Sequence, residues 1–471
     1  MPLFRYSKTY MKPTRKVFNW HKNLLALDRI TPPWDKIKII GREFITKNPI
    51  KNGIVTLEQT FLPLIKLKWK VLHGDYSEGK SFQDSLISGP LKKWTHKHDF
   101  KKLSSSSTTI EDTIQFDHWI SLNRLNKFTL DRLHKSFDYR SKIIEHDLEN
   151  LYDNINNNYI LISGATGMIG GDLVPLLNSL GYKIIILKFD KNSENDGYPN
   201  NYSSGNKDII TFRWNPYSQN TLIIPKEISN KIKFLVNLSG ENILGVWTKS
   251  KKDLILKSRI SSTRSLYQIL KVNSIRLDCS IHASATGFYG SKKSNILDEN
   301  NSSGLGFLAE TTKEWEKEQN KFSKFANRNI NLRIGTVLSS KGGLIKLLEL
   351  PFRLGVAGHI GEGKNYMNWI LLEDLIRIIA NALQNKRLSG PVNAVSPNPI
   401  QSKEFFHALA KKYNSKFFIK IPSFIPKILS KELVDEIIIS DQKIAPKQLL
   451  KNNYSFLADD INKALDNIIS I

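Results

Sequence analysis

The sequence predicts two folded units, an α+β unit first and then an α/β unit with a doubly wound parallel sheet. In the later part, short apolar strands alternate with helical stretches, which is typical of a parallel sheet with helices on both faces. In the earlier part, strands with a period-2 alternation precede one long helix. At 471 residues, the chain is long enough for more than one domain of about 100–200 residues.

The expected boundaries follow changes in composition. An Asn-rich run at 154–158 stands directly before a buried strand and is interpreted as part of a linker. We expect an α+β unit at 1–150, a linker at 151–158, the parallel-sheet unit at 159–400 and a helical C-terminal piece at 401–471.

The first unit is expected to place a sheet against its last helix. In Leu64–Leu72, apolar residues alternate with lysines, as in a sheet with one face in water. The spacing of apolar residues in Thr129–Leu148 predicts the closing helix. The other expected elements are a helix at Thr14–Leu27, strands at Trp94–Phe100 and Glu111–Trp119, and a Ser-rich turn at Lys101–Thr109.

Two histidines fall on one face of the predicted strand Trp94–Phe100. His96 and His98 could be metal ligands, but no third ligand stands at an obvious spacing in the sequence. Trp94 and Phe100 share the same face. We therefore expect the histidines to line an aromatic cavity and expect no metal site.

The segments of residues 1–145 follow an order known from one domain family. They include YSKTYMKPTRKVFNWH, LDRITPPWD, DYSEGKSFQDSLISGPLKKWTHKHDF and FDYRSKII. This order resembles the START/polyketide-cyclase-like (SRPBCC) helix-grip domains. The resemblance implies a cavity between sheet and helix that binds an apolar ligand, and it leaves the identity of that ligand open.

The second unit is expected to form one parallel sheet. Because the carboxyl ends of parallel strands share an edge, ligands of such sheets bind there. The predicted strands are Tyr159–Ser163, Lys183–Leu187, Phe234–Leu238, Ser280–Ala285 and Asn331–Leu338, with an Asn/Ser-rich surface loop at 191–207.

The strongest motif follows the first of these strands, where YILIS runs into a glycine-rich turn and a helix. Gly164, Gly167 and Gly170 permit the tight turn, the approach of the backbone to a pyrophosphate, and close packing of helix and strand. Main-chain N–H groups at the helix N-terminus favour the negative charge. The motif predicts a Rossmann-type dinucleotide site. Its expected cofactor-binding residues are Gly164, Ala165, Thr166, Gly167, Met168, Ile169 and Gly170.

The end of the second strand distinguishes NADP from NAD. An acidic residue there usually holds the ribose of NAD, whereas a cation accommodates the 2′-phosphate of NADP. Lys188 directly follows Leu187, so NADP is the expected cofactor. Asp190 lies two residues further on and keeps NAD as the alternative.

Further motifs occur in a fixed order along the second unit. They are Trp214–Pro216, Val236–Ile243, Ser258–Arg259, Ser284–Gly290, Phe307–Glu310, Arg333–Gly335, Pro351–Gly355 and Asn368–Ile370. Over 159–471 this order closely resembles the atypical extended short-chain dehydrogenase/reductases of the NAD-dependent epimerase/dehydratase-like family, a group also labelled as cell-division inhibitors. The resemblance implies that Leu238, Ser239 and Gly240 bind the adenosine half of the cofactor and that Ser284 is catalytic.

The chain departs from that family at the proton-transfer pair. Ordinary members use a Tyr as general acid/base and a Lys four residues later that lowers the pKa of the Tyr. The resemblance aligns Leu308 and Thr312 with these positions, and neither can transfer a proton. Tyr289 is the nearest alternative general acid. Alternatively, Tyr289 is only part of the cavity wall. Ser284 and Tyr289 are therefore the expected catalytic residues.

Several polar residues nearby have competing interpretations. The family pattern also has a Glu at the position of Glu310. The alternative is that Glu310 caps its helix or lies on a solvated helix face. His282 shares a strand face with Ser284, yet without an elbow or an acid this pair does not predict a hydrolase. Arg353 and Asn368 fall where extended members bind substrate, so they are the expected substrate-binding residues for an anionic or hydroxylated ligand.

Composition restricts the setting of the protein. The net charge of +25 comes from lysines scattered along the chain, which favours a solvated basic surface over nucleic-acid binding. The sequence contains no apolar run of about 18 residues, so no membrane span is predicted. The N-terminus lacks a secretory signal pattern, and a cytoplasmic location is therefore expected. The single cysteine, Cys279, is expected to be a buried thiol.

Taken together, these observations predict an NADP(H)-dependent oxidoreductase or epimerase-like enzyme that acts on a small molecule and carries an apolar-ligand-binding N-terminal domain. Loss of the Tyr/Lys pair keeps one alternative open. In that alternative, the protein binds NADP(H) as a non-catalytic regulator or sensor.

Overall fold

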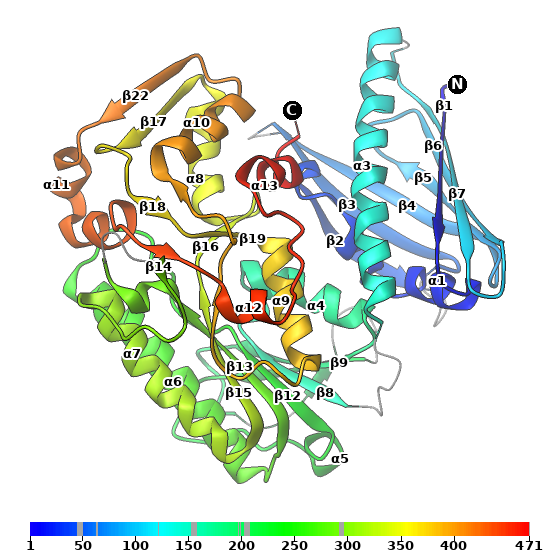
Figure 1. Ribbon diagram of the computed structural model, residues 1–471. Helices are drawn as coiled ribbons and strands as arrows, with labels where there is room; N and C mark the ends of the chain where they lie inside the picture. The colour runs from blue at the N-terminus through cyan, green and yellow to red at the C-terminus, as the bar shows by residue number, and fades with distance from the viewer. Residues whose placement is uncertain are drawn as a thin grey trace. The chain divides into compact units, whose positions relative to one another are not determined.

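A computed structural model describes residues 1–44, 50–62, 65–120, 122–151, 158–195, 197, 199–201, 208–291 and 296–470 (Figure 1). The chain forms two compact units, one made mainly of residues 1–155 and one made mainly of residues 156–471. Of the predicted linker 151–158, only Leu151 and Asn158 lie within the described residues.

The first unit is a seven-stranded antiparallel sheet with a long helix, which confirms the predicted helix-grip type of fold. The strands follow the order β1-β7-β6-β5-β4-β3-β2. They are β1 (Leu3–Tyr10), β2 (Ile37–Phe44), β3 (Gly53–Leu62), β4 (Ile65–Ser77), β5 (Ser81–Ser88), β6 (Lys93–Lys102) and β7 (Thr108–Asp117). The helices are α1 (Thr14–His21), α2 (Ala26–Ile30), the short 3₁₀ turn η1 (Pro33–Asp35) and α3 (Asn123–Glu149).

The predicted helix Thr14–Leu27 is wrong in extent, because α1 ends at His21 and α2 begins at Ala26. Between them, the main-chain N–H of Leu25 donates to Oδ1 of Asn23, a local bond that favours a turn over a continuous helix. The expected turn Lys101–Thr109 is shorter than predicted, since β6 continues to Lys102 and β7 begins at Thr108.

The second unit is the predicted doubly wound sheet of Rossmann type. The strands follow the order β10-β11-β9-β8-β12-β13-β15-β20, and all neighbours are parallel except β10 and β11. They are β8 (Tyr159–Ser163), β9 (Lys183–Phe189), β10 (Pro199–Asn201), β11 (Ile209–Trp214), β12 (Ile232–Asn237), β13 (Leu277–Ala285), β15 (Ala326–Ile334) and β20 (Gly390–Ala394). The central strand β8 is buried along its whole length, as expected for a parallel strand covered on both faces.

Helices and short strand pairs complete this unit. The helices are α4 (Met168–Ser179), α5 (Lys226–Ser229), α6 (Lys249–Val272), η2 (Thr286–Tyr289), α7 (Phe307–Asn320), η3 (Lys321–Lys324), α8 (Gly343–Arg353), α9 (Leu372–Gln384), α10 (Ser402–Lys412), α11 (Phe424–Leu433), the π-helical turn η4 (Val434–Ile438), α12 (Lys447–Lys451) and α13 (Ile461–Ile468). The short strands are β14 (Ile296–Leu297), β16 (Thr336–Leu338), β17 (Val356–Ile360), β18 (Tyr366–Met367), β19 (Trp369–Leu371), β21 (Ile400–Gln401), β22 (Phe417–Ile421) and β23 (Lys443–Ile444).

The predicted strand Asn331–Leu338 is in fact broken at Gly335. A side chain at Gly335 would place its Cβ only 2.6 Å from the carbonyl oxygen of Asn368. After Ile334 the main-chain N–H of Thr336 donates to that carbonyl (2.7 Å), and β16 pairs with β19 instead of continuing in the main sheet. The predicted surface loop 191–207 also contains a short strand, β10, while residues 202–207 lie outside the described residues.

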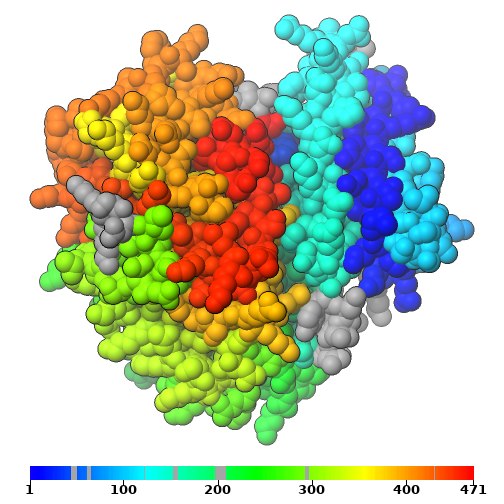
Figure 2. All heavy atoms as spheres, viewed as in Figure 1, coloured from blue at the N-terminus to red at the C-terminus, as the bar shows by residue number. Residues whose placement is uncertain are grey.

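The C-terminal residues return to strands that precede them by many residues. Strand β23 pairs in parallel with β14, and the main-chain N–H groups of Leu457 and Ala458 donate to the carboxylate of Asp374 in α9. Figure 2 shows these C-terminal residues, in red, covering part of the second unit. None of the helices within the described ranges is both long and apolar enough to span a bilayer.

Candidate functional site

The glycine turn after β8 has no room for a side chain at two of its glycines. Gly164 has φ of +75°, and a Cβ on it would lie 2.7 Å from the main chain of Leu238. A Cβ on Gly170 would lie 2.4 Å from the carbonyl oxygen of Gly164. Gly167 and Thr166 are exposed on the outer side of the turn. The turn is therefore a cradle that side chains would fill.

The structure brings the two predicted cofactor segments together. The N–H of Leu238 donates to the carbonyl of Ser163 (3.0 Å). The carboxamide oxygen of Asn237 accepts from the hydroxyl of Ser163 (2.8 Å) and from the N–H of Ser239 (3.2 Å). A fully buried Asn237 thus fixes the end of β12 beside the glycine turn, and Gly240 remains exposed at its rim.

Arg259 in α6 is a cation at this rim that the sequence did not single out as a site residue. A Cβ on Gly240 would lie 3.3 Å from the guanidinium carbon of Arg259. The guanidinium donates to the carbonyls of Glu241 (3.1 Å) and Ile255 (2.9 Å) and stacks 5.1 Å from the ring of Trp315. Burial lowers the pKa of Arg259 to about 10. Its position in the Ser258–Arg259 motif was the available signal.

Two cations stand at the neighbouring strand ends. Lys188 is exposed in β9 and is the register partner of Arg213 in β11, so both side chains leave the same face of the sheet. Arg213 lies 3.8 Å from the carboxylate of Asp190, and Oδ1 of Asp190 also accepts from the N–H of Asn192. The sequence prediction missed Arg213 because it did not predict β11, although the apolar run IITFRW was a usable signal.

Ser284, at the end of β13, belongs to a buried network. Its hydroxyl donates to Oε1 of Glu316 over 2.6 Å. Arg333 from β15 donates to both oxygens of Glu316, each at 2.9 Å. All three side chains are almost completely buried. The network therefore joins β13, α7 and β15, and it could not be read from the sequence because its partners are far apart along the chain.

Tyr289 is connected to the same network through Arg333. The phenolic oxygen accepts from Nη1 of Arg333 (3.0 Å) and donates to Oδ1 of Asn393 (2.8 Å). The ring is completely buried, and this burial raises the pKa of Tyr289 against the opposing effect of Arg333. The structure thus links Ser284 with Tyr289 and gives both hydroxyls protein partners.

The positions aligned with the usual Tyr/Lys pair lie in the first turns of α7. Leu308 packs against Gly287, whose Cβ would lie 3.1 Å from that of Leu308. The hydroxyl of the buried Thr312 donates to the carbonyl of Leu308. The carboxylate of Glu436 accepts from the N–H groups of Phe307 and Leu308, while Glu310 is exposed. Capping of α7 is therefore performed by Glu436.

The two predicted substrate-binding residues lie in separate local networks. Arg353 donates to Glu349 one turn earlier in α8 (2.9 Å) and stacks on Tyr413. Asn368 is buried, donates to the carbonyl of Gln442 (2.8 Å) and accepts from the N–H of Ile444 (2.9 Å). Asn368 therefore holds the returning C-terminal strand β23.

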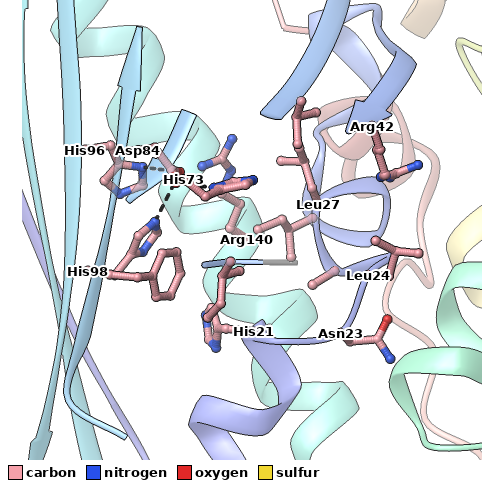
Figure 3. A pocket seen from close by; sticks show the side chains of 15 residues that line it. His21, Asn23, Leu24, Leu27, Arg42, His73, Asp84, His96, His98 and Arg140 are labelled. Atoms are coloured by element: carbon pink, nitrogen blue, oxygen red, sulfur yellow. Dashed lines mark hydrogen bonds and ion pairs between the residues drawn. The ribbon is translucent and has the colours of Figure 1, made fainter. Parts of the chain in front are cut away.

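The first unit contains a cavity of about 90 Å³, with the histidines of β6 on one side and Leu24 and Leu27, beside Asn23 and Arg42, on the other (Figure 3). Leu24, Leu27 and Phe82 are among its apolar lining residues. The polar end includes His96 and His98, and the structure adds Asp84 to them. Burial lowers the pKa of His96 to about 4. Burial alone would also lower the pKa of His98, but the carboxylates of Asp112 and Asp84 raise it to about 9.

Comparison with known proteins shows similarity over the second unit. The model of the NAD dependent epimerase/dehydratase family matches residues 160–309. An epimerase family protein from Bacillus subtilis is 30% identical over 314 residues, which cover 66% of this chain and 98% of that protein. An epimerase family protein from Mycobacterium bovis is 30% identical over 312 residues, which cover 66% of this chain and 97% of that protein.

Two solved structures extend the comparison to the fold. A nucleoside-diphosphate sugar epimerase from Corynebacterium glutamicum is 25% identical with a TM-score of 0.74, and the match covers 98% of this chain and 89% of that chain. A human epimerase family protein, solved with NADPH, is 24% identical with a TM-score of 0.56, and the match covers 66% of this chain and 98% of that chain. The first match includes both units.

Proposed function

Because this chain belongs to the NAD-dependent epimerase/dehydratase family, we propose that its second unit binds NADP(H) and uses it in an oxidoreductase or epimerase-like reaction on a small molecule. The observation that carries the proposal is the cradle at Gly164 and Gly170, which would close if either glycine carried a Cβ. The proposed cofactor site is completed by Leu238, Ser239 and Gly240. A bound cofactor supplies hydride transfer.

The choice of NADP over NAD rests on the charges beside β9 and β11. Lys188 and Arg213 are register partners with exposed side chains, so both can reach a 2′-phosphate. Asp190 is the residue that would favour NAD. Its carboxylate faces Arg213 and accepts a hydrogen bond from the N–H of Asn192 in the same loop. A carboxylate held in this way is less free to accept from ribose hydroxyls.

We propose that Arg259 stabilises an anionic group of the cofactor or substrate that lies near Gly240. Its guanidinium is bonded to main-chain carbonyls and lies directly behind Gly240. A cation in that position stabilises a phosphate or carboxylate of cofactor or substrate through charge-assisted bonds. Lys251, which pairs with Glu241 at 2.6 Å, adds a further cation to the same rim.

We propose that Ser284 and Tyr289 form the buried wall of the cofactor and substrate site. Each hydroxyl is directed to buried protein groups: Glu316 for Ser284, and Arg333 and Asn393 for Tyr289. Proton transfer by Tyr289 requires that one of these bonds open toward the substrate. If Tyr289 is the catalytic acid, as the sequence motif indicates, one of these bonds opens when the substrate binds. If it is not, we expect both bonds to stay closed.

These buried hydroxyls also favour a second candidate function. With Leu308 and Thr312 in the places of the proton-transfer pair, the unit is equally suited to bind NADP(H) as a sensor without turnover. The two functions share the nucleotide site and differ in chemistry. Turnover of the bound nucleotide with a small carbonyl or nucleotide-sugar substrate therefore distinguishes them.

For the first unit, we propose a START-like domain that binds a small ligand with an apolar part. The element order, one strand, two helices, six strands and a long helix, supports this proposal. So does the cavity, whose wall is apolar on the side of α2. A ligand seated there would place its polar end toward the histidine cluster of β6.

Calorimetric titration of the full chain with NADPH and NADH tests the proposal for the second unit. We expect saturable binding of NADPH and binding of NADH weaker by about 10–100-fold, the value of one to two charge-assisted bonds. Absence of heat with both coenzymes from a folded protein would exclude the nucleotide site. A panel of carbonyl compounds and nucleotide sugars, monitored through the reduced nicotinamide absorbance, then separates enzyme from sensor.

A further inference from the structure

The polar end of the first unit's cavity is assembled by strand register. Asp84 in β5 lies directly opposite His96 in β6, and His98 in β6 lies directly opposite Asp112 in β7. His73 in β4 is the register partner of Asp84 on its other side. Because residues two apart in a strand point to the same face, all five side chains gather on the cavity side of the sheet.

Asp112 fixes the orientation of both imidazole rings of β6. Its Oδ1 lies 3.0 Å from Nε2 of His96 and 2.7 Å from Nδ1 of His98. An ionised carboxylate only accepts hydrogen bonds, so the two nitrogens that face it carry the protons. The remaining nitrogens are Nδ1 of His96, which keeps a lone pair, and Nε2 of His98, where a metal ion would have to displace a proton. This is the arrangement in which carboxylates orient metal-binding histidines.

Both of these nitrogens face the same carboxylate oxygen, as Figure 3 shows. Oδ2 of Asp84 lies 4.0 Å from Nδ1 of His96 and 3.6 Å from Nε2 of His98. Each of the three residues offers one possible ligand atom, and these atoms all lie within 4.8 Å of one another. The other oxygen of Asp84 is held by Nδ1 of His73 at 2.5 Å. Asp84 is therefore anchored through one oxygen and presents the other to the two rings.

The separations distinguish a metal ion from a shared proton. Distances of 3.6 and 4.0 Å exceed the usual N–H···O range of about 2.7–3.2 Å. Two ligand atoms on a tetrahedral ion with bonds of about 2.1 Å stand about 3.4 Å apart, so the two distances from Oδ2 of Asp84 would have to shorten by about 0.2 and 0.6 Å. Two imidazoles and one carboxylate suit a divalent transition metal such as zinc.

We propose that Oδ2 of Asp84, Nδ1 of His96 and Nε2 of His98 bind a divalent transition-metal ion in the cavity of the first unit. Three protein ligands leave a coordination position open. That position faces a cavity also lined by Arg140, whose buried Nε has no hydrogen-bond partner among the described residues. With two carboxylates, one divalent ion and one guanidinium, the site carries an excess positive charge that favours an anionic oxygen ligand.

Titration of the chelator-treated full chain with Zn²⁺ by calorimetry tests the site. We expect one ion per chain, and no heat with Mg²⁺, which prefers oxygen ligands. Asp84→Asn and His98→Gln should each weaken zinc binding by more than about 100-fold, beyond the loss of about 10–100-fold expected for the orienting residue in Asp112→Asn. His118→Gln removes an imidazole of the same unit that lies outside the proposed site and hydrogen-bonds to Thr129. This variant should bind zinc as the native chain does.

A second measurement keeps the test independent of how the variants fold. The native full chain loaded with Co²⁺ should show visible absorption bands typical of nitrogen and oxygen ligation, and Zn²⁺ should abolish them. Far-ultraviolet circular dichroism and thermal unfolding identify any variant that is unfolded. The proposal is overturned if the native chain takes up no stoichiometric zinc, or if folded Asp84→Asn and His98→Gln bind zinc as tightly as the native chain.

Discussion

Ser284 donates a 2.6 Å hydrogen bond to the carboxylate of Glu316, and both side chains are buried. Within the described residues, Glu316 is also the only acidic side chain that forms an ion pair with Arg333. This relationship ties a residue in the place of a catalytic serine to the stability of the sheet. It leads to the first prediction.

Glu316→Gln should destabilise the second unit by about 3–5 kcal/mol, because it leaves the buried guanidinium of Arg333 without a counter-charge. Ser284→Ala should cost about 1–3 kcal/mol, since Arg333 still satisfies Glu316. Urea unfolding measures both. The control is Ser280→Ala, whose hydroxyl donates to a neutral amide of Asn329 and should cost less. Equal losses for all three variants would contradict the network.

Gly170→Ala should abolish NADPH binding, because its Cβ would meet the carbonyl oxygen of Gly164 at 2.4 Å. Gly171→Ala is the matched control: nothing lies within 4 Å of a Cβ there, so binding should be unchanged. Alanine should even stabilise α4 by about 0.8–1.0 kcal/mol. Fluorescence titration with NADPH gives the affinities. Similar affinities for the two variants would show that the turn is not the binding site.

Lys188→Ala and Arg213→Ala should each weaken NADPH binding by about 10–100-fold, the value of a charge-assisted bond to phosphate. NADH binding should hardly change, because NADH lacks the 2′-phosphate. Lys183→Ala, at the opposite end of β9, serves as the control and should affect neither coenzyme. If the variants lose affinity for NADPH and NADH equally, Lys188 and Arg213 do not bind the 2′-phosphate.

His282 should make the second unit sensitive to acid. Burial lowers the pKa of His282 to about 3 from the usual 6.5, so the folded state holds the neutral ring. The unfolded state binds the proton below pH 6.5, and stability therefore falls as the pH drops from 6.5 toward 3. The loss attributable to His282 should reach about 2 kcal/mol at pH 5. His282→Leu should remove this part of the difference between urea midpoints at pH 5 and pH 7.5, and an unchanged difference would contradict the assignment.

Asn368→Asp should destabilise the C-terminal part of the second unit by about 1–3 kcal/mol. The change replaces the amide donor by an oxygen that faces the carbonyl of Gln442. Limited proteolysis near β23 and thermal unfolding report the effect. A substrate-binding role would instead leave stability unchanged and raise KM, so the two measurements decide between the roles.

The sequence was sufficient for features that depend on neighbours in the chain. The turn at Gly164, Gly167 and Gly170 follows from strand, glycine spacing and helix, and the parallel sheet around it is confirmed. The burial of Cys279 followed from its apolar strand and is also confirmed. The break at Gly335 could not be predicted, because it depends on the carbonyl of Asn368 in a later segment.

Residue types and local order therefore determined the two fold classes, the nucleotide turn and the cation at Lys188. Tertiary structure alone decided which polar groups meet: Glu316 and Arg333 with Ser284, and Asp84 with His96 and His98. The physical reason is that strand order and register bring together side chains whose separation in sequence carries no information. Hydrogen bonds and ion pairs between them act over a few ångströms in space, whatever the length of chain between the partners.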